Sequence, residues 1–446
     1  MATSSPAQEV TRRIVEQFSR ARRSFRFATD VAVLSGGASL GHLFTIAAAP
    51  ILTRLYLPRD IGDLGLFNAF LGVVTIAASL QYDVAIISAP CQRDAAHLTR
   101  LSMLLTIPTS VAGGLLLYAM IRFSLMGFGV LPAYAAALMV PTIFFAGLFS
   151  VLRYWSLREE KFGTVANAFI FQNGARNISQ VALGAMGLHS FGVLFGEVLG
   201  RGIGMSRMMR NTWPVVREYA LNLRDATETL RNNRRFPVYS LPSSILNQLG
   251  TSLPLPLLVT LYGADVGGYY SLVWRALAVP VAVVGSSVAD AFHSRCALYA
   301  RENPKGILQF FHRTTLALLA IGIIPAVAIF IFGEPIFLFV FGTKWRFSGT
   351  IASIVAPWFL TSFIVSPLSR LVYVLRGQRL KLIYDVLILG GNLMVFFLAR
   401  QRGWPELDMV IAMSGINTIS KVVYYFVLLR IASTAMHASE RPLKAA

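Results

Sequence analysis

The sequence predicts an all-α integral membrane protein, with about twelve transmembrane helices in two parallel six-helix bundles around a central cavity. Of its 446 residues, 55% are hydrophobic and 14% are charged, whereas soluble domains carry about 25% charged residues. The apolar residues form blocks of about twenty, and each block can cross a hydrocarbon core of about 30 Å as a helix. The alternating strands of about ten residues that a membrane barrel requires are not visible, so helices must satisfy the backbone polar groups.

Twelve apolar blocks follow one another, separated by short basic or Gly/Pro-containing joints. The first block is too long for the apolar region of a signal peptide, so no cleavable signal peptide is expected. The predicted spans are 31–53, 64–88, 99–121, 129–152, 164–186, 189–206, 238–261, 267–292, 314–332, 350–373, 382–399 and 408–430.

The distribution of basic residues predicts the orientation of these spans. With the N-terminus inside, the inner segments hold 28 of the 40 Lys and Arg residues and the outer loops hold seven. Because Lys and Arg concentrate on the cytoplasmic side, both termini are predicted to be cytoplasmic. The net charge of +19 is therefore attributed mainly to topology, and no nucleic-acid partner is expected.

The longest polar stretch, residues 207–236, divides the chain into two halves. Its apolar residues keep helical spacing and its arginines fall on another face, which predicts an amphipathic segment along the anionic inner leaflet. The basic N-terminal tail has the same character. The predicted domains are a basic cytoplasmic tail (1–29), an N-terminal six-helix lobe (30–206), the linker (207–236), a C-terminal six-helix lobe (237–431) and a cytoplasmic tail (432–446).

An internal repeat relates the two halves. Leu55–Gly62 joins the first two spans, and Leu261–Gly267 joins the seventh and eighth. Both begin with Leu-Tyr, continue through a Gly or Pro break, and end with Asp, a β-branched residue and Gly. The Asp can cap the incoming helix and the Gly permits a tight turn. Two halves of the same orientation form a parallel repeat, an architecture that favours alternating access.

Metal, disulfide and nucleotide chemistry are not expected. The two cysteines, Cys91 and Cys296, lie near predicted cytoplasmic helix ends, so neither a structural disulfide nor a metal site is predicted. No phosphate-binding glycine loop ending in Lys-Ser/Thr is present. We therefore predict no cofactor and no catalytic centre.

Ionisable residues inside predicted spans are the candidate functional residues, because such groups are costly in a membrane. Arg275 lies about eight residues into the eighth span, or roughly 12 Å deep, and is expected to line the cavity or to extend toward the helix end. Arg176 lies near the middle of the fifth span beside Gln172, Asn173, Asn177 and Gln180. This polar strip either lines a cavity or packs between helices.

The remaining candidates have weaker patterns. Glu197 and Arg201 are four residues apart and are expected to form an ion pair; Glu197 is also a candidate for ion coupling. Asp83 and Asp290 occupy corresponding cytoplasmic positions in the two halves and either form a gate or are solvated; like Glu197, both are also candidates for proton or sodium coupling. Lys421 and Arg370 are further candidates for the cavity, with Lys421 the deeper of the two.

Two blocks carry a resemblance to a known family. The first runs from Pro50 to Asp60 and continues through Gln81-Tyr82-Asp83. The second contains Phe236-Pro237, Leu241-Pro242-Ser243, Asn247, Leu253-Pro254, Tyr262-Gly263, Val266-Gly267, Tyr269-Tyr270, Leu272, Arg275 and Pro280. The sequence resembles the polysaccharide flippases of the multidrug/oligosaccharidyl-lipid/polysaccharide exporter superfamily. Relatives often carry a basic residue at the position of Gln81, so this sequence departs from the family there.

The resemblance implies a bacterial inner-membrane protein that moves undecaprenyl-diphosphate-linked oligosaccharide from the cytoplasmic to the periplasmic leaflet. Asn247 joins the candidate cavity residues because it lies within the second block. The resemblance also implies contact with membrane lipids, and a polysaccharide polymerase and chain-length proteins are candidate partners.

Three alternatives stay open at this stage. A drug or cation antiporter of the same superfamily should favour acidic intramembrane residues, whereas the deep charges here are mainly Arg. A major-facilitator carrier should have a Gly/Asp/Arg-rich motif between spans two and three, which Cys91–Asp94 matches poorly. A membrane polysaccharide polymerase or glycosyltransferase usually has a large outer loop or an acidic cluster, but the longest outer loop here, 333–349, is short.

Overall fold

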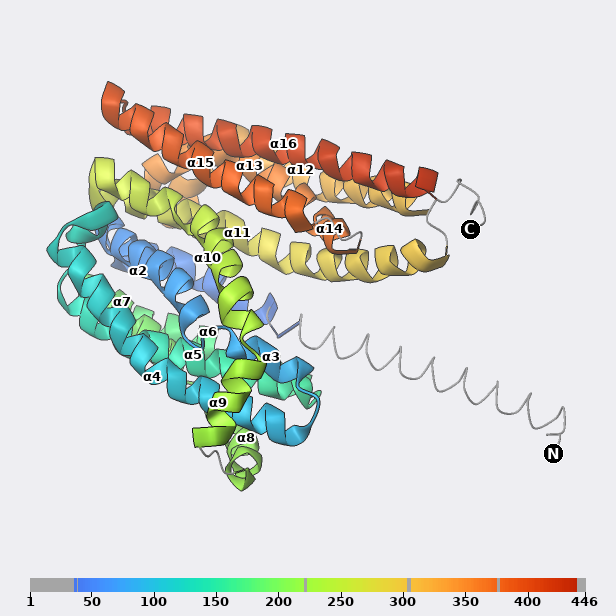
Figure 1. Ribbon diagram of the computed structural model, residues 1–446. Helices are drawn as coiled ribbons and strands as arrows, with labels where there is room; N and C mark the ends of the chain where they lie inside the picture. Colours follow the sequence, from blue (N-terminus) through green and yellow to red (C-terminus); the bar gives the residue numbers. More distant parts are fainter. Residues whose placement is uncertain (1–35, 38, 220–222, 303–305, 375–377, 439–446) are drawn as a thin grey trace, which may run out of the picture.

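The computed structural model describes residues 36–37, 39–219, 223–302, 306–374 and 378–438. Across these ranges the regular structure is helical, without strands, which confirms the predicted fold class. The helices form two lobes that meet at one end and diverge toward the other (Figure 1). The predicted basic tail 1–29 and the last part of the predicted C-terminal tail lie outside the described residues.

The first lobe contains an apolar helix at Ser39–Leu55 and the helices of the first half of the sequence. Its predicted second span, 64–88, is wrong as a single helix: Leu80 and Gln81 have positive φ angles of 52° and 65°, and this left-handed backbone ends one helix and begins the next. The elements are α2 (Pro58–Ala77), α3 (Tyr82–Ser88), α4 (Gln92–Arg122), η1 (Leu125–Val130), α5 (Tyr134–Arg158), α6 (Phe162–Ala185) and α7 (His189–Gly202).

The polar linker is helical and packs against the first lobe. It forms α8 (Ser206–Glu218) and α9 (Leu223–Asn232), which contact α4 and α5 below that lobe (Figure 1). The Tyr82 hydroxyl donates to the Leu230 carbonyl over 3.4 Å, and Arg93 forms an exposed 3.3 Å ion pair with Asp225.

The second lobe contains the helices of the second half. Gly263, with φ 86° and ψ 179°, reverses the chain inside α11, so α11 holds the end of the seventh predicted span and the whole of the eighth. Pro242 and Pro254 stand at helix starts, where proline is tolerated. The elements are η2 (Phe236–Ser240), α10 (Leu241–Ser252), α11 (Pro254–Glu302), α12 (Gly306–Phe341), η3 (Thr343–Trp345), α13 (Arg346–Leu368), α14 (Leu371–Val374), α15 (Gln378–Arg402) and α16 (Glu406–Ala438).

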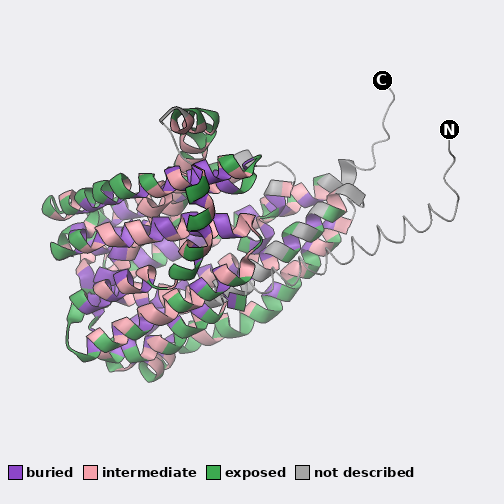
Figure 2. Cartoon of the chain, turned by 90° about the horizontal axis from the view of Figure 1, so that it is seen from below, coloured by how far each residue is buried: buried purple, intermediate pink, exposed green. Residues whose placement is uncertain are grey.

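Among the described residues, eight helical segments are long and apolar enough to cross a membrane. Each of the twelve predicted spans overlaps helical residues, but α6 and α7 are not among the eight, so the count of twelve goes beyond what length and composition establish. Exposed and buried residues alternate along the same helices (Figure 2). On α12 the exposed side chains are large and apolar, including Leu316, Ile324 and Phe339, as expected for a face that meets lipid.

The internal repeat forms a direct contact between the two lobes. We call the end of the molecule that holds the Leu55–Pro58 and Leu261–Gly263 turns the hairpin end. A Cβ added to Gly62 would lie 2.1 Å from the Ala264 carbonyl oxygen, and one added to Gly268 would lie 1.8 Å from the Pro58 carbonyl oxygen. Backbones approach this closely only where the side chain is absent. The buried Trp345 indole adds a hydrogen bond to the Thr53 carbonyl, 2.9 Å long.

Candidate substrate-binding site between the lobes

The polar strip of α6 positions Arg176 inside the first lobe. Arg176 lies nine residues before the last residue of α6, which is roughly 14 Å along the helix. Its guanidinium donates to Thr45 Oγ1 over 3.1 Å and to Asn173 Oδ1 over 2.6 Å. These neutral acceptors orient the guanidinium but leave its positive charge uncompensated.

Glu197 on α7 supplies a carboxylate beside two guanidinium groups. Its side chain is 2% exposed, and its Oε1 lies 2.9 Å from Arg201 Nη2 and 3.7 Å from Arg176 Nη1. The ion pair between Glu197 and Arg201 that the four-residue spacing predicts is therefore present. Gly200 allows α7 to approach α6 here, because a Cβ at this position would lie 2.3 Å from the Cβ of Arg176.

The second lobe adds a third guanidinium to the same place. Arg275 lies on α11, twelve residues after the Gly263 turn, or roughly 18 Å along the helix. Its Nη2 donates to Asn177 Oδ1 of α6 over 3.1 Å, and Arg275 is close enough to Arg176 and Glu197 to interact with both electrostatically. We call Arg176, Glu197, Arg201 and Arg275 the arginine cluster. It joins the two lobes and carries three positive charges against one negative charge.

The arginine cluster is costly to bury, because its positive charges outnumber its single negative charge. An ion pair taken out of water is stable only when its partners also satisfy the remaining hydrogen-bonding groups. Glu197 offsets one of the three guanidinium charges, and the amide and hydroxyl oxygens of α6 and the Ser39–Leu55 helix solvate the others. The surplus of two positive charges favours a ligand with two negative charges, which Arg can bind through paired hydrogen bonds.

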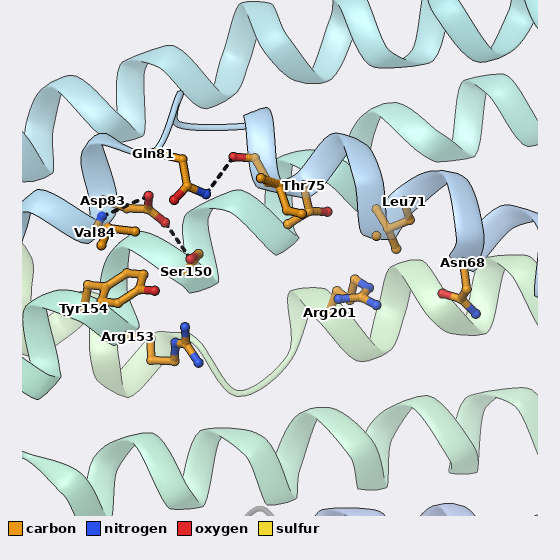
Figure 3. A pocket seen from close by; sticks show the side chains of 12 residues that line it. Asn68, Leu71, Thr75, Gln81, Asp83, Val84, Ser150, Arg153, Tyr154 and Arg201 are labelled. Atoms are coloured by element: carbon orange, nitrogen blue, oxygen red, sulfur yellow. Dashed lines mark hydrogen bonds between the residues drawn. The ribbon is translucent and has the colours of Figure 1, made fainter. Parts of the chain in front are cut away.

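A cavity of about 450 Å³ lies beside the arginine cluster in the first lobe (Figure 3). Arg201 belongs to both, and Arg153 of α5 brings a second guanidinium to the cavity wall. Gln81 also lines the cavity, so the two arginines supply positive charge near the position where Gln81 itself has none. Such a volume falls within the roughly 300–1,000 Å³ of small-molecule sites. The other lining residues are Asn68, Leu71, Gly72, Thr75, Ile76, Asp83, Val84, Ser150 and Tyr154.

Asp83 lies in the wall of this cavity rather than in open solvent at a helix end. The residue is 5% exposed. Its carboxylate accepts hydrogen bonds of 2.6 Å from the hydroxyls of Ser79 and Ser150 (Figure 3). The hydroxyl groups hold the charge in place, and the structure records no ion pair between Asp83 and a basic residue among the described residues.

Lys421 and Asn247 belong to a separate polar group in the second lobe. Asn247 of α10 donates to Asp385 Oδ2 over 3.1 Å, and Lys381 binds the same carboxylate over 2.8 Å. Lys421 of α16 lies 5.6 Å from the centre of the Tyr384 ring, a cation–π distance. This group contains two lysines and one carboxylate, so it is also positive overall.

The other sequence candidates do not join either group. Arg370 is exposed after α13, and the side chain of Asp290 lies outside the described residues. Gln180 joins helices, since its side-chain amide donates to the Val193 carbonyl and its backbone carbonyl accepts from the Tyr56 hydroxyl. Asn177 and Gln180 are thus both buried in contacts between helices, and the cavity of about 450 Å³ has no lining residue from α6. Cys91 and Cys296 are both free, and the described residues hold no group of metal ligands.

Sequence reasoning missed Arg153 and the second role of Arg201. Arg153 looked like an ordinary basic residue of a cytoplasmic helix end, and Arg201 like the partner of Glu197 alone. Only the placement of α5 and α7 around α2 reveals that both reach one cavity (Figure 3).

Two lobes related by an internal repeat, with polar groups buried between helices, define a two-lobed, all-helical membrane fold. The chain is similar in structure to the lipid II flippase MurJ in an inward closed conformation, with a TM-score of 0.68 and 13% identity over 90% of each chain. It is also similar to a multidrug resistance MATE family transporter of the MOP superfamily in its inward-facing conformation. That comparison has a TM-score of 0.66 and 14% identity over 90% of this chain and 96% of the transporter.

An outward-facing MATE family transporter of the MOP superfamily is less similar, with a TM-score of 0.54 and 14% identity over 91% of this chain and 96% of the other. The sequence pattern of the family described as "Polysaccharide biosynthesis protein" matches residues 51–349. The chain belongs to this family. Comparison with curated protein sequences gave no match.

Proposed function

We propose that this protein moves undecaprenyl-diphosphate-linked oligosaccharide units from the cytoplasmic to the periplasmic leaflet of a bacterial inner membrane, by alternating access. The observation that carries this proposal is the meeting of Arg275 from one lobe with Arg176 and Arg201 from the other around a single carboxylate. A surplus of two guanidinium charges suits a diphosphate. A cationic cargo would be repelled, which argues against drug or cation antiport.

The physical problem of such a transporter is the headgroup. A diphosphate with sugars needs a wet, positively charged path, whereas a polyprenyl tail can stay in the lipid. The arginine cluster would receive the phosphates, and the adjoining cavity of about 450 Å³ would hold the first sugars against Gln81, Asn68 and Tyr154. Polar side chains there offer both donors and acceptors for hydroxyl groups. The MurJ likeness and the family match support a lipid-linked substrate for this chain.

The membrane potential supplies a driving force for this direction of transport. Moving one charge across the membrane is worth about 2.3 kcal/mol per 100 mV. Two negative charges moving toward the positive outer side would therefore gain roughly 4.6 kcal/mol per 100 mV. We expect the transport rate to rise when an outside-positive potential is imposed.

Headgroup flipping in proteoliposomes tests the proposal. Arg275→Ala should reduce flipping of a lipid-linked oligosaccharide by tenfold or more, because loss of a charge-assisted contact costs about 1.5–3 kcal/mol. The matched control is Arg400→Ala, which removes an exposed arginine at the hairpin end. Undiminished flipping by Arg275→Ala would exclude this residue from the mechanism. Formation of longer sugar chains without flipping would instead indicate a polymerase.

A further inference from the structure

Two buried carboxyl groups share one hydroxyl at the hairpin end. Asp60 and Asp63, on the first two turns of α2, are 4% and 1% exposed. The hydroxyl oxygen of Ser190, at the start of α7, lies 2.7 Å from Asp60 Oδ1 and 2.7 Å from Asp63 Oδ2. Both distances are those of O–H···O hydrogen bonds.

A serine hydroxyl carries a single hydrogen and can donate to only one of these oxygens. If both carboxyl groups were ionised, the other 2.7 Å contact would bring two acceptors together without a hydrogen between them. Asp63 Oδ1 is a second and separate observation: it is buried and has no hydrogen-bond partner in the described part of the chain. A buried charged oxygen without a donor is strongly disfavoured.

We propose that Asp63 binds a proton at the contact between the two lobes. The Asp63 carboxylic acid donates from Oδ2 to Ser190, and Ser190 donates to Asp60. Asp60 is the ionised partner because its Oδ2 accepts from the Leu57 backbone N–H over 2.9 Å and lies 3.8 Å from His189 Nδ1. This assignment gives every oxygen of the relay its hydrogen and leaves Asp63 Oδ1 neutral.

Other charged and titratable groups face this site from each neighbouring element. Arg59 of α2 is exposed and lies close enough to Asp63 to interact with it electrostatically. Asp265, on the second lobe's side of the contact, interacts with Asp63 in the same way. Tyr134 of α5 lies close enough to both carboxyl groups to interact with them electrostatically. The Tyr56 hydroxyl, near Asp60, donates its hydrogen to the backbone carbonyl of Gln180.

Release of the proton would add a second negative charge next to the lobe contact. The O–H bond of Asp63 breaks, and the proton passes through Ser190 and Asp60 to water beside the His189 imidazole, which is 67% exposed. The new charge repels Asp60 and also Asp265, which precedes Gly268 by three residues on α11. Protonation therefore holds the hairpin end together, and deprotonation favours its opening. This inference concerns the lobe contact and is independent of the cargo.

Infrared difference spectroscopy of the full-length protein in lipid vesicles tests the proton directly. When the buffer is changed from acidic to alkaline, the parent should lose the C=O band of a buried carboxylic acid. Asp63→Asn should lack that band, whereas Asp94→Asn, which removes an acid from the first turn of α4 at the other end of the lobe, should keep it. Ser190→Ala keeps both carboxyl groups and should shift the band.

A distance measurement then tests the effect on the lobes. Spin labels at Phe123→Cys and Gln401→Cys, exposed on different lobes, are placed in a chain whose Cys91 and Cys296 are replaced. Their separation should increase at alkaline pH in the parent and stay constant in Asp63→Asn. A carboxylic acid band that persists in Asp63→Asn, or an unchanged pH response of that variant, overturns the proposal. Neither readout requires substrate, so neither depends on the proposed transport function.

Discussion

Adding one methyl group at Gly268 should weaken the contact between the two lobes at the hairpin end. In Gly268→Ala the new Cβ would lie 1.8 Å from the Pro58 carbonyl oxygen, whereas ordinary contacts begin at 3.4 Å. The backbones of α2 and α11 must therefore separate by more than an ångström for the hairpin end to stay joined. Neither partner can move aside by rotation of a side chain, because the atoms in conflict belong to the main chain.

The magnitude follows from the cost of overpacking. Extra methyl groups in a packed region cost about 1–3 kcal/mol, and each 1.4 kcal/mol is a factor of ten in an equilibrium. We therefore expect the population with an open hairpin end to rise by roughly 5- to 150-fold. Spin labels at Phe123→Cys and Gln401→Cys report that population as a longer distance between the lobes.

The control for Gly268→Ala is Gly250→Ala, also a glycine within a helix of the second half. A Cβ at Gly250 would have nothing within 4 Å, so this variant changes helix propensity to a similar extent without touching the other lobe. If the two variants gave the same distance distribution, the glycine-to-carbonyl contact would have no part in holding the lobes together.

Two further predictions concern the arginine cluster. Glu197→Gln removes the carboxylate shared by Arg176 and Arg201 and should lower the free energy of unfolding by about 3–5 kcal/mol. In thermal unfolding, added pyrophosphate should restore part of this loss by binding the unpaired guanidinium groups. Equal effects of pyrophosphate on the parent and on the variant would contradict this explanation. Gly200→Ala, whose Cβ would lie 2.3 Å from the Cβ of Arg176, should reduce flipping at least tenfold. Gly174→Ala on α6 has open space around its Cβ and should leave the flipping rate unchanged. Equal flipping by the two variants would show that Arg176 need not be held in place.

Much of the fold is predictable from the sequence because lipid imposes a simple rule on each segment. An apolar block must be helical wherever it lies, so α6, α7 and α15 agree with their predicted spans to within four residues at each end. Other helices run further, and α12 extends eight residues before and nine residues beyond its predicted span. The break between α2 and α3 was missed for a physical reason. Leu80 and Gln81 adopt left-handed backbone conformations that these residue types rarely favour, and neither glycine nor proline marks the position.

The candidate site was predictable only in part. Arg275, Arg176 and Glu197 stand out because a charge within an apolar block is unusual, and the structure brings these three together. Their proximity could not be predicted, since Asn177 of α6 and Arg275 of α11 are 98 residues apart in sequence and meet through tertiary packing. Arg153 gave no signal, because an arginine near a cytoplasmic helix end is normal in a membrane protein.

The contact between Gly62 and Gly268 has a consequence for how the two halves can evolve. Each half contributes one glycine and one carbonyl group, so the joint is built from main-chain atoms. Substitutions elsewhere leave such a joint intact. The charged side chains within the lobes can therefore differ between the halves, with Arg176, Glu197 and Arg201 in the first and Lys381 and Asp385 in the second. The repeat thus leaves the side chains of each half free to differ while the main-chain contact between the halves stays the same.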